Sequence, residues 1–318
     1  MKTSKSITVF ACMVLTLVAC KKDDDQPQVG NGTQLTNFFS TNVSNGKQVF
    51  TINAGTGGAV FGVKGTKIYV APNSLFSLSG ALITGNVQLE LVEIYDRAGM
   101  VMMNKPTMGE LPNGNRSTLI SGGEYYLKIT QNGQEVLAPD GVFVSMPTDN
   151  TGGVDLNMSL FDLVIETTDQ WWDLVADSVA IGQDSMQGGW GSSYDILDGQ
   201  WGWTNVDRFY DDPRPKTVLK AQLPNGYDNT NCEVYLTFDG EATALASLDT
   251  YTNDGYFSEH YGLIPIGLEV HFIVVTMIDN QLHYAIQGAT ITNGHIEQIN
   301  SFTPITQAEL AALINALP

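Results

Sequence analysis

Short apolar runs rich in β-branched and aromatic residues recur along this chain, and polar segments containing Gly and Asn separate them. Runs of this length and composition between turn residues are typical of β-strands. They predict strands at 49–52, 67–70, 87–94, 117–120, 124–130, 142–147, 217–222, 233–238, 268–278 and 282–287. Asp279 and Asn280 form a two-residue hairpin turn between the last two runs. The pattern predicts an all-β protein.

A helical period occurs at the C-terminal end. Thr306 and Glu309 have the spacing of a capping box. Apolar residues then follow at i, i+3, i+4 and i+7: Leu310, Leu313, Ile314 and Leu317. This pattern predicts a short amphipathic helix over 306–317 that docks on a sheet. One segment before residue 300, 160–179, also hints at a helix.

The chain of 318 residues is long enough for two domains of ordinary size. We predict two β-sandwich-like domains, at 49–148 and 201–318, with the short helix closing the second. Between them, 149–200 is acidic, rich in Gly and Trp, and is expected to be a connector.

The first 25 residues carry features of a bacterial targeting signal. Lys2 and Lys5 precede an apolar stretch, 7–17, that is too short to span a bilayer. Residues 17–20 read Leu-Val-Ala-Cys and resemble the bacterial lipobox, which implies that residues 1–19 are removed and Cys20 is acylated. An ordinary secretory signal with a chance cysteine is the alternative. The lipid on Cys20 would then be the membrane anchor.

The run after Cys20, Lys-Lys-Asp-Asp-Asp at 21–25, resembles the surface-export tag of Bacteroidota lipoproteins. The resemblance implies a lipid-anchored, surface-exposed protein of the outer membrane. A merely solvated tether would also be charged, so that alternative stays open. The polar stretch that follows makes 20–48 a predicted flexible tether.

Residues 65–75 read Gly-Thr-Lys-Ile-Tyr-Val-Ala-Pro-Asn-Ser-Leu and resemble the start of ZU5-like β-sandwich modules; 85–91 and 119–125 continue the resemblance. The family implies a β-sandwich that carries protein contacts. Some ZU5 tandems cleave themselves at a His-Phe-Ser step. Here His271 and Phe272 precede Ile273, which has no nucleophilic hydroxyl, so that activity is not implied.

Charge and cysteine content exclude several classes of protein. With 15 basic and 34 acidic residues the formal net charge is −19, and such a surface repels phosphate backbones, so no nucleic-acid partner is expected. Cys12 lies in the leader and Cys20 in the lipobox, which leaves only Cys232 and no disulfide framework. Cys232 alternates with Val234, as a small core residue would; a reactive thiol is the alternative.

Known metal and catalytic motifs are missing from the sequence. In the predicted hairpin register, His271 and His283 point to opposite faces, although a one-residue slip would bring them together. The run 249–255 resembles a calcium loop but lacks a ligand at its third position. Nucleophile elbows and P-loops are absent. We therefore predict no metal, no cofactor and no enzymatic activity.

The densest cluster of ligand-binding residue types is 201–212, which begins Trp-Gly-Trp. Indole faces stack on the C–H surfaces of sugars, and amide or carboxylate groups bind hydroxyls. If the cluster is a site, the residues expected to carry it are Trp203, Asn205, Asp207 and Arg208. Paired indoles can equally be core residues, and catalysis is a further reading. The polar loop 249–261, with three tyrosines, is the second candidate.

These observations predict a non-catalytic binding or scaffolding module with a glycan or an envelope protein as its ligand. The alternatives are an envelope hydrolase whose site assembles from the second domain, and a structural subunit of an outer-membrane complex. Ser178 and Ser185 lie in Asp-Ser-aliphatic runs that resemble a Bacteroidota O-glycosylation sequon. A chance match to so short a pattern is the alternative.

Overall fold

The computed structural model describes residues 29–166, 169–176, 178–186 and 189–318, and these residues are mostly β. They also form three α-helices and a short 3-10 turn at Thr148–Thr151. The predicted β-rich composition and C-terminal helix are confirmed. The leader, Cys20 and the charged run after it lie outside the described residues.

The first two sheets share one apolar core. A nine-stranded sheet has the order β1 (Gln48–Asn53), β5 (Asn86–Ile94), β7 (Arg116–Gln131), β14 (Gly202–Phe209), β10 (Ser159–Glu166), β11 (Asp169–Ala176) and β6 (Met108–Glu110), with β8 (Gln134–Leu137) beside β7 and β4 (Phe76–Ser77) beside β8. A five-stranded sheet has the order β12 (Ala180–Met186), β13 (Gly189–Asp198), β9 (Val142–Pro147), β3 (Lys67–Val70) and β2 (Gly58–Phe61). Alternate residues of both sheets, such as Leu89, Leu127 and Val144, are buried between them. Period-two alternation thus builds this core.

Two further sheets, of four and five strands, form the other half of the molecule. One has the order β18 (Thr250–Tyr251), β19 (Phe257–Pro265), β15 (Lys216–Gln222) and β22 (Ile296–Gln298). The other has the order β17 (Leu245–Ser247), β16 (Cys232–Phe238), β20 (Glu269–Ile278), β21 (Gln281–Thr290) and β23 (Thr303–Pro304). Leu219, Leu236 and Phe272 belong to the core that they share.

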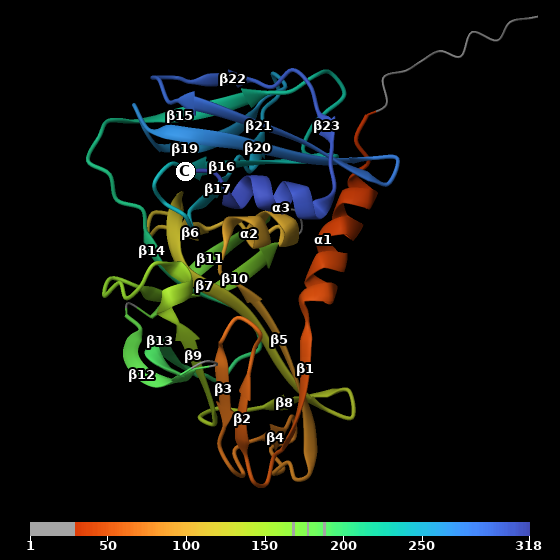
Figure 1. Ribbon diagram of the computed structural model, residues 1–318, viewed down its shortest axis with the longest axis vertical. Coiled ribbons are helices and arrows are strands. Elements are labelled where there is room, and N and C mark those ends of the chain that lie inside the picture. Colours follow the sequence, from red (N-terminus) through yellow and green to blue (C-terminus); the bar gives the residue numbers. More distant parts are fainter. Residues whose placement is uncertain (1–28, 167–168, 177, 187–188) are drawn as a thin grey trace, which may run out of the picture.

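A helical layer joins the two halves. Figure 1 shows α2 (Arg97–Met103) and α3 (Gln307–Asn315) between the two groups of sheets, with α1 (Gly32–Gly46) along one side. All three helices contribute to a third apolar cluster that includes Leu35, Met100 and Leu310. The Arg97 guanidinium donates to the carbonyl of Leu317 at 2.7 Å, which ties the C-terminal end of the chain to α2.

The expectation of a flexible tether over 20–48 is wrong for Gly32–Gly46, which is helical. Asn31 caps this helix, since its side chain accepts a hydrogen bond from the Gln34 amide at 3.0 Å. Leu35 and Phe39, one turn apart, are buried against the rest of the protein. A polar composition concealed a helix whose narrow apolar face becomes stable only on docking.

The prediction of a helix over 160–179 is also wrong, because β10 and β11 form an antiparallel hairpin there. Phe161 and Trp172 are fully buried on one face of it. The segment 149–200, expected to be a connector, supplies strands to the nine-stranded sheet and to the sheet β12-β13-β9-β3-β2. The strand β14 pairs with β7 and so belongs to the nine-stranded sheet. The second half of the molecule therefore begins after Phe209 and not at residue 201 as predicted. Tertiary pairing overrode the local signal in both cases.

The C-terminal hairpin and helix agree with the sequence except in one detail. Asp279 and Asn280 have φ values of 49° and 61°, and the register pairs Thr276 with His283 as predicted. The capping box of α3 is present and Ile314 is buried. Leu313, expected on the docked face, is 43% exposed, because α3 buries a narrower stripe.

Candidate binding cavity

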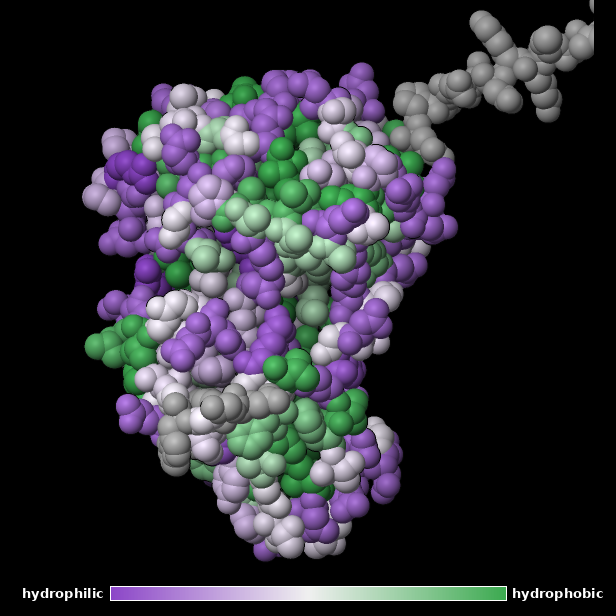
Figure 2. All heavy atoms as spheres, viewed as in Figure 1, coloured by the Kyte–Doolittle hydropathy of each residue, from purple (hydrophilic) through white to green (hydrophobic). Residues whose placement is uncertain are grey.

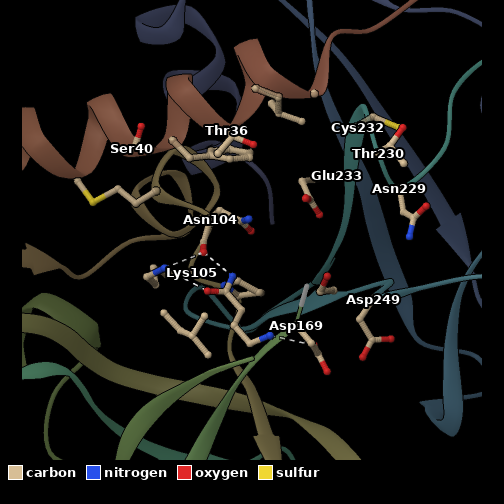
Figure 3. A pocket seen from close by; sticks show the side chains of 18 of the residues that line it. Thr36, Ser40, Asn104, Lys105, Asp169, Asn229, Thr230, Cys232, Glu233 and Asp249 are labelled. Carbon is tan, nitrogen blue, oxygen red and sulfur yellow. Dashed lines mark hydrogen bonds between the residues drawn. The ribbon is translucent and has the colours of Figure 1, made fainter. Parts of the chain in front are cut away.

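A cavity of about 520 Å³ lies where α1, the loop after α2, the β10–β11 hairpin and β16 converge. Its size is within the ordinary range of ligand sites. Figure 3 shows α1 across its top, Asn104 and Lys105 facing the helix from below, and Asp169 and Asp249 at one side. The lining therefore comes from segments far apart in the sequence.

The helix α1 supplies a wall that is partly apolar and partly hydroxylic. Leu35 and Phe39 line the cavity together with Thr36 and Ser40. The Asn42 amide holds the helix in place by donating to the Met102 carbonyl at 2.9 Å in a buried contact. This wall can contact the hydrocarbon part of a ligand and donate hydrogen bonds beside it.

The opposite wall is organised around Asn104, which ends α2 in the left-handed region with φ of 50°. Its carbonyl accepts from the Gln170 side chain at 2.6 Å and from Lys105 Nζ at 3.2 Å. Its side-chain oxygen accepts from the Tyr235 hydroxyl at 2.8 Å. Asn tolerates this backbone conformation better than most residues, so the turn holds three neighbouring side chains in place.

Lys105 is a cation already bound by the protein. Its ammonium donates to Gln170 Oε1 at 3.1 Å and lies 5.3 Å from the centre of the Trp203 ring. Burial lowers its pKa, and the nearby Glu124 opposes that shift. These contacts make Lys105 part of the wall and leave it little capacity for a ligand.

At the edge of the cavity, Arg116 links the β10–β11 hairpin to the loop between β17 and β18. It makes a two-pronged contact with Asp169, each N–O distance being 2.6 Å, and lies 3.6 Å from Asp249. The Trp171 ring stacks 4.3 Å from the guanidinium carbon, and the Tyr261 hydroxyl donates to Asp249 at 2.8 Å. Both acids at this edge therefore have partners within the protein, and they share one guanidinium charge.

Glu233 differs from these groups. It follows Cys232 at the start of β16 and points into the cavity in Figure 3. Among the described residues no hydrogen-bond or ion-pair partner contacts its carboxylate. Burial raises the pKa of Glu233 to about 7. A carboxyl group with a raised pKa therefore faces an open space.

The residues predicted from the sequence do not form one open site. Trp203 packs against Tyr126, with ring centres 5.7 Å apart, and is half-buried. Asn205 and Asp207 are completely buried, and the Asn205 amide donates to Asp207 at 2.6 Å. Arg208 pairs with Asp155 at 2.6 Å. The structure thus places Asn205 and Asp207 in the interior, whereas Trp203 and Arg208 are half-buried.

Asp207 has a second buried acid for a neighbour. Glu124, on β7, is opposite Asn205 in the strand pairing, and both of its carboxylate oxygens lack hydrogen-bond partners, as does Asp207 Oδ1. Burial raises the pKa of both acids well above its ordinary value, and the nearness of Asp207 raises that of Glu124 further. Lys105 lies close enough to oppose this rise at Glu124, and both carboxyl groups are closed to ligands because they are completely buried.

Of the remaining candidates, Cys232 and Asp249 of the loop 249–261 line the cavity. His271 and His283 point apart as predicted, and His271 Nδ1 is 2.8 Å from Asp239. Residues 252–256 close the turn between β18 and β19. Cys232 is buried, and burial raises the pKa of its thiol. Within the described part of the chain, no group of three His, Cys, Asp or Glu side chains could hold a metal ion.

Sequence reasoning missed α1 and Glu233, which together define the cavity. The Asn31 cap and the i, i+4 spacing of Leu35 and Phe39 were the available signals for the helix. Glu233 carried no such signal, since a charged residue next to two apolar ones on a strand is expected to face water.

Comparison with known proteins adds no relative to this picture: no family model matches the chain, and no curated protein matches its sequence. None of the helices in the described ranges has both the length and the apolar character needed to cross a membrane.

Proposed function

We propose that this chain is a lipid-anchored, surface-exposed binding protein, built from two β-sandwich-like domains, that captures an envelope protein through a lysine or arginine side chain. The observation that carries the proposal is Glu233, an acid without a partner on the wall of the cavity. The occupant would supply the positive charge that the described residues do not supply to Glu233.

The lining suits a long basic side chain. Leu35 and Phe39 can pack along its methylene stem, as apolar surfaces do with lysine and arginine. A cation close to Glu233 favours the ionised carboxylate and lowers its pKa. Binding near pH 7 should therefore release part of a proton from Glu233, and affinity should weaken below pH 7 as the free acid becomes fully protonated.

The membrane anchor rests on the lipobox resemblance at Cys20. Gly32, where α1 begins, is the twelfth residue after Cys20, so the intervening chain spans at most roughly 40 Å. The cavity beside α1 would then stay close to the membrane, within reach of other envelope proteins. Labelling with a palmitate analogue should mark the wild-type chain and not Cys20→Ala, and external protease should digest it on intact cells.

The binding test uses residues 21–318, which retain every described residue. Calorimetric titration with acetyl-Gly-Gly-Lys-Gly-Gly-amide, the matching Arg peptide and a norleucine peptide compares charge at equal length. We expect the Lys and Arg peptides to bind and the norleucine peptide to fail. Glu233→Gln should weaken binding at least about tenfold, a loss of 1.4 kcal/mol.

Glu166→Gln is the matched control, because Glu166 lines the same cavity but is exposed. It should retain the wild-type affinity. Equal binding of all three peptides, or equal loss in both Gln variants, would contradict a specific role for Glu233.

One observation favours a hydrolase as a second candidate. An acid with a pKa of about 7 has the property expected of a general acid, and Asp249 lines the same cavity. Release of nitrophenol from nitrophenyl glycosides, lost in Glu233→Gln, would support this alternative and displace the binding proposal.

A further inference from the structure

A second surface lies on the outer face of the sheet β12-β13-β9-β3-β2, away from its buried core. Strand pairing places Tyr69 opposite Phe143, and Phe143 opposite Leu197, so that one row crosses three strands. These side chains are 38%, 43% and 54% exposed. Their neighbours along each strand, such as Ile68 and Val144, point inward and are fully buried.

The row has the shape of a shallow platform. The Tyr69 and Phe143 rings are 6.1 Å apart, with 40° between their planes. They border a hollow of about 470 Å³ that also reaches Leu197. Figure 2 shows hydrophobic side chains gathered on the lower part of the molecule, in the region where β3 and β2 run in Figure 1.

A polar row runs beside the apolar one. Lys67 is opposite Ser145, and Ser145 is opposite Asp195. The Ser193 hydroxyl donates to Asp195 at 2.7 Å and orients that carboxylate. The absence of a side chain at Gly182 leaves room for the Asp195 carboxylate, because a Cβ at that position would lie 1.9 Å from Asp195 Oδ2. Hydrogen-bonding groups of defined position therefore border the rings.

The two rows together indicate the chemistry of the occupant. Lys67 and Asp195 carry opposite charges, so the charges of the described lining residues cancel, on a chain whose net charge is −19. Aromatic faces are electron-rich and attract the polarised C–H bonds on the flat side of a pyranose ring. Hydroxyl groups at the ring edge need donors and acceptors, which the polar row supplies.

We propose that this face binds a neutral oligosaccharide, with sugar rings stacked on Tyr69 and Phe143 and hydroxyls directed to Lys67 and Asp195. None of these side chains lines the cavity beside α1. The proposal therefore stands or fails independently of the function assigned to Glu233.

The test titrates residues 21–318 with the neutral hexasaccharides cellohexaose, xylohexaose, mannohexaose, laminarihexaose and maltohexaose, and follows tyrosine and tryptophan fluorescence and heat. At least one should bind, and Tyr69→Ala and Phe143→Ala should each lower its affinity about tenfold or more. Ile296→Ala is the matched control, since Ile296 is 48% exposed on β22 of another sheet. It should bind as the wild type does, and so should Glu233→Gln.

Three results would overturn the proposal. One is the absence of saturable binding for all five sugars. Another is equal affinity in the wild type and both aromatic variants, which would move the sugar elsewhere. The third is a concentration-dependent dimer in sedimentation that Tyr69→Ala abolishes, which would make this face a contact between two copies of the chain.

Discussion

The cavity beside α1 and the outer face of β12-β13-β9-β3-β2 are two candidate binding surfaces of different construction. The cavity is assembled from a helix, a hairpin, a turn and a strand that are up to 217 residues apart, from Gly32 to Asp249. The sheet face arises from alternate residues on adjacent strands. The cavity therefore depends on every packed layer, whereas the platform depends on the register of three strands.

Two glutamates on the strands of the first and second halves sharpen this contrast. Glu124 and Glu233 both have a raised pKa because of burial. Glu124 is completely buried, whereas Glu233 lines the cavity. Burial perturbs both acids in the same direction, but only the one that reaches open space can meet a ligand.

The largest loss of stability is expected when a buried side chain that supports the cavity is removed. Trp172 is completely buried, and its indole N–H donates to the carbonyl of Pro106, a cavity residue, at 2.9 Å. Trp172→Ala should lower the free energy of unfolding by about 3–5 kcal/mol in urea titrations. Leu174→Ala on the same strand, at a 40% exposed position, is the control and should cost much less. Equal losses would show that this part of β11 is not packed as described.

The pH dependence of stability should separate the two glutamates. A raised folded pKa makes stability highest below the ordinary value of 4.5 and lowers it as pH rises, by about 1.4 kcal/mol per pH unit for one group. Glu124→Gln should remove one such slope over the whole range in which Glu124 stays protonated. Glu233→Gln should remove a slope that ends near pH 7.

Urea titrations between pH 4.5 and 9 measure both slopes. Identical pH profiles for the wild type and Glu124→Gln would contradict a raised pKa at Glu124. A Glu233→Gln difference that keeps growing above pH 7 would contradict the smaller shift at the cavity.

Helix caps give a smaller effect that distinguishes the cavity wall from a purely structural helix. Asn31→Ala and Thr306→Ala each remove an N-cap, of α1 and α3 respectively, and should cost about 1 kcal/mol. Only Asn31→Ala should also weaken binding of the Lys peptide, because α1 lines the cavity. Calorimetric titration of both variants with the Lys peptide measures this effect. Equal peptide affinity in the two variants would show that α1 does not contribute to the binding site.

The smallest stability effect is expected at the platform. Tyr69→Ala removes an exposed side chain and should change the free energy of unfolding by no more than about 0.5 kcal/mol. Tyr125→Ala, at a completely buried position in the core beneath, is the contrasting variant and should cost several-fold more. A large loss in Tyr69→Ala would mean that the ring supports the fold and does not serve a ligand.

Much of the fold was predictable because its signals are local. The β9 and β3 runs were found with the bounds that the structure has, and the hairpin at Asp279 gave the correct register for His283. Each depends on turn chemistry and alternation within a few residues. The helix α1 and the β10–β11 hairpin were mispredicted, since their stability comes from packing partners distant in sequence.

The candidate site was less predictable for the same reason. The cluster from Trp203 to Arg208 had the composition of a ligand site, but two of its four candidate side chains, Asn205 and Asp207, are completely buried. Tyr69 and Phe143 became a platform only when pairing set them side by side. Composition shows which types of side chain are present, and strand pairing decides which of these side chains are exposed to solvent.

By itself the sequence determined the β-rich class, the hairpin register, the C-terminal cap and the net negative charge, because each follows from neighbouring residues or from a sum over the chain. Only the tertiary structure decided that Glu233 lines a cavity while Glu124 is sealed. Access to solvent depends on how distant segments pack, and no local pattern encodes it.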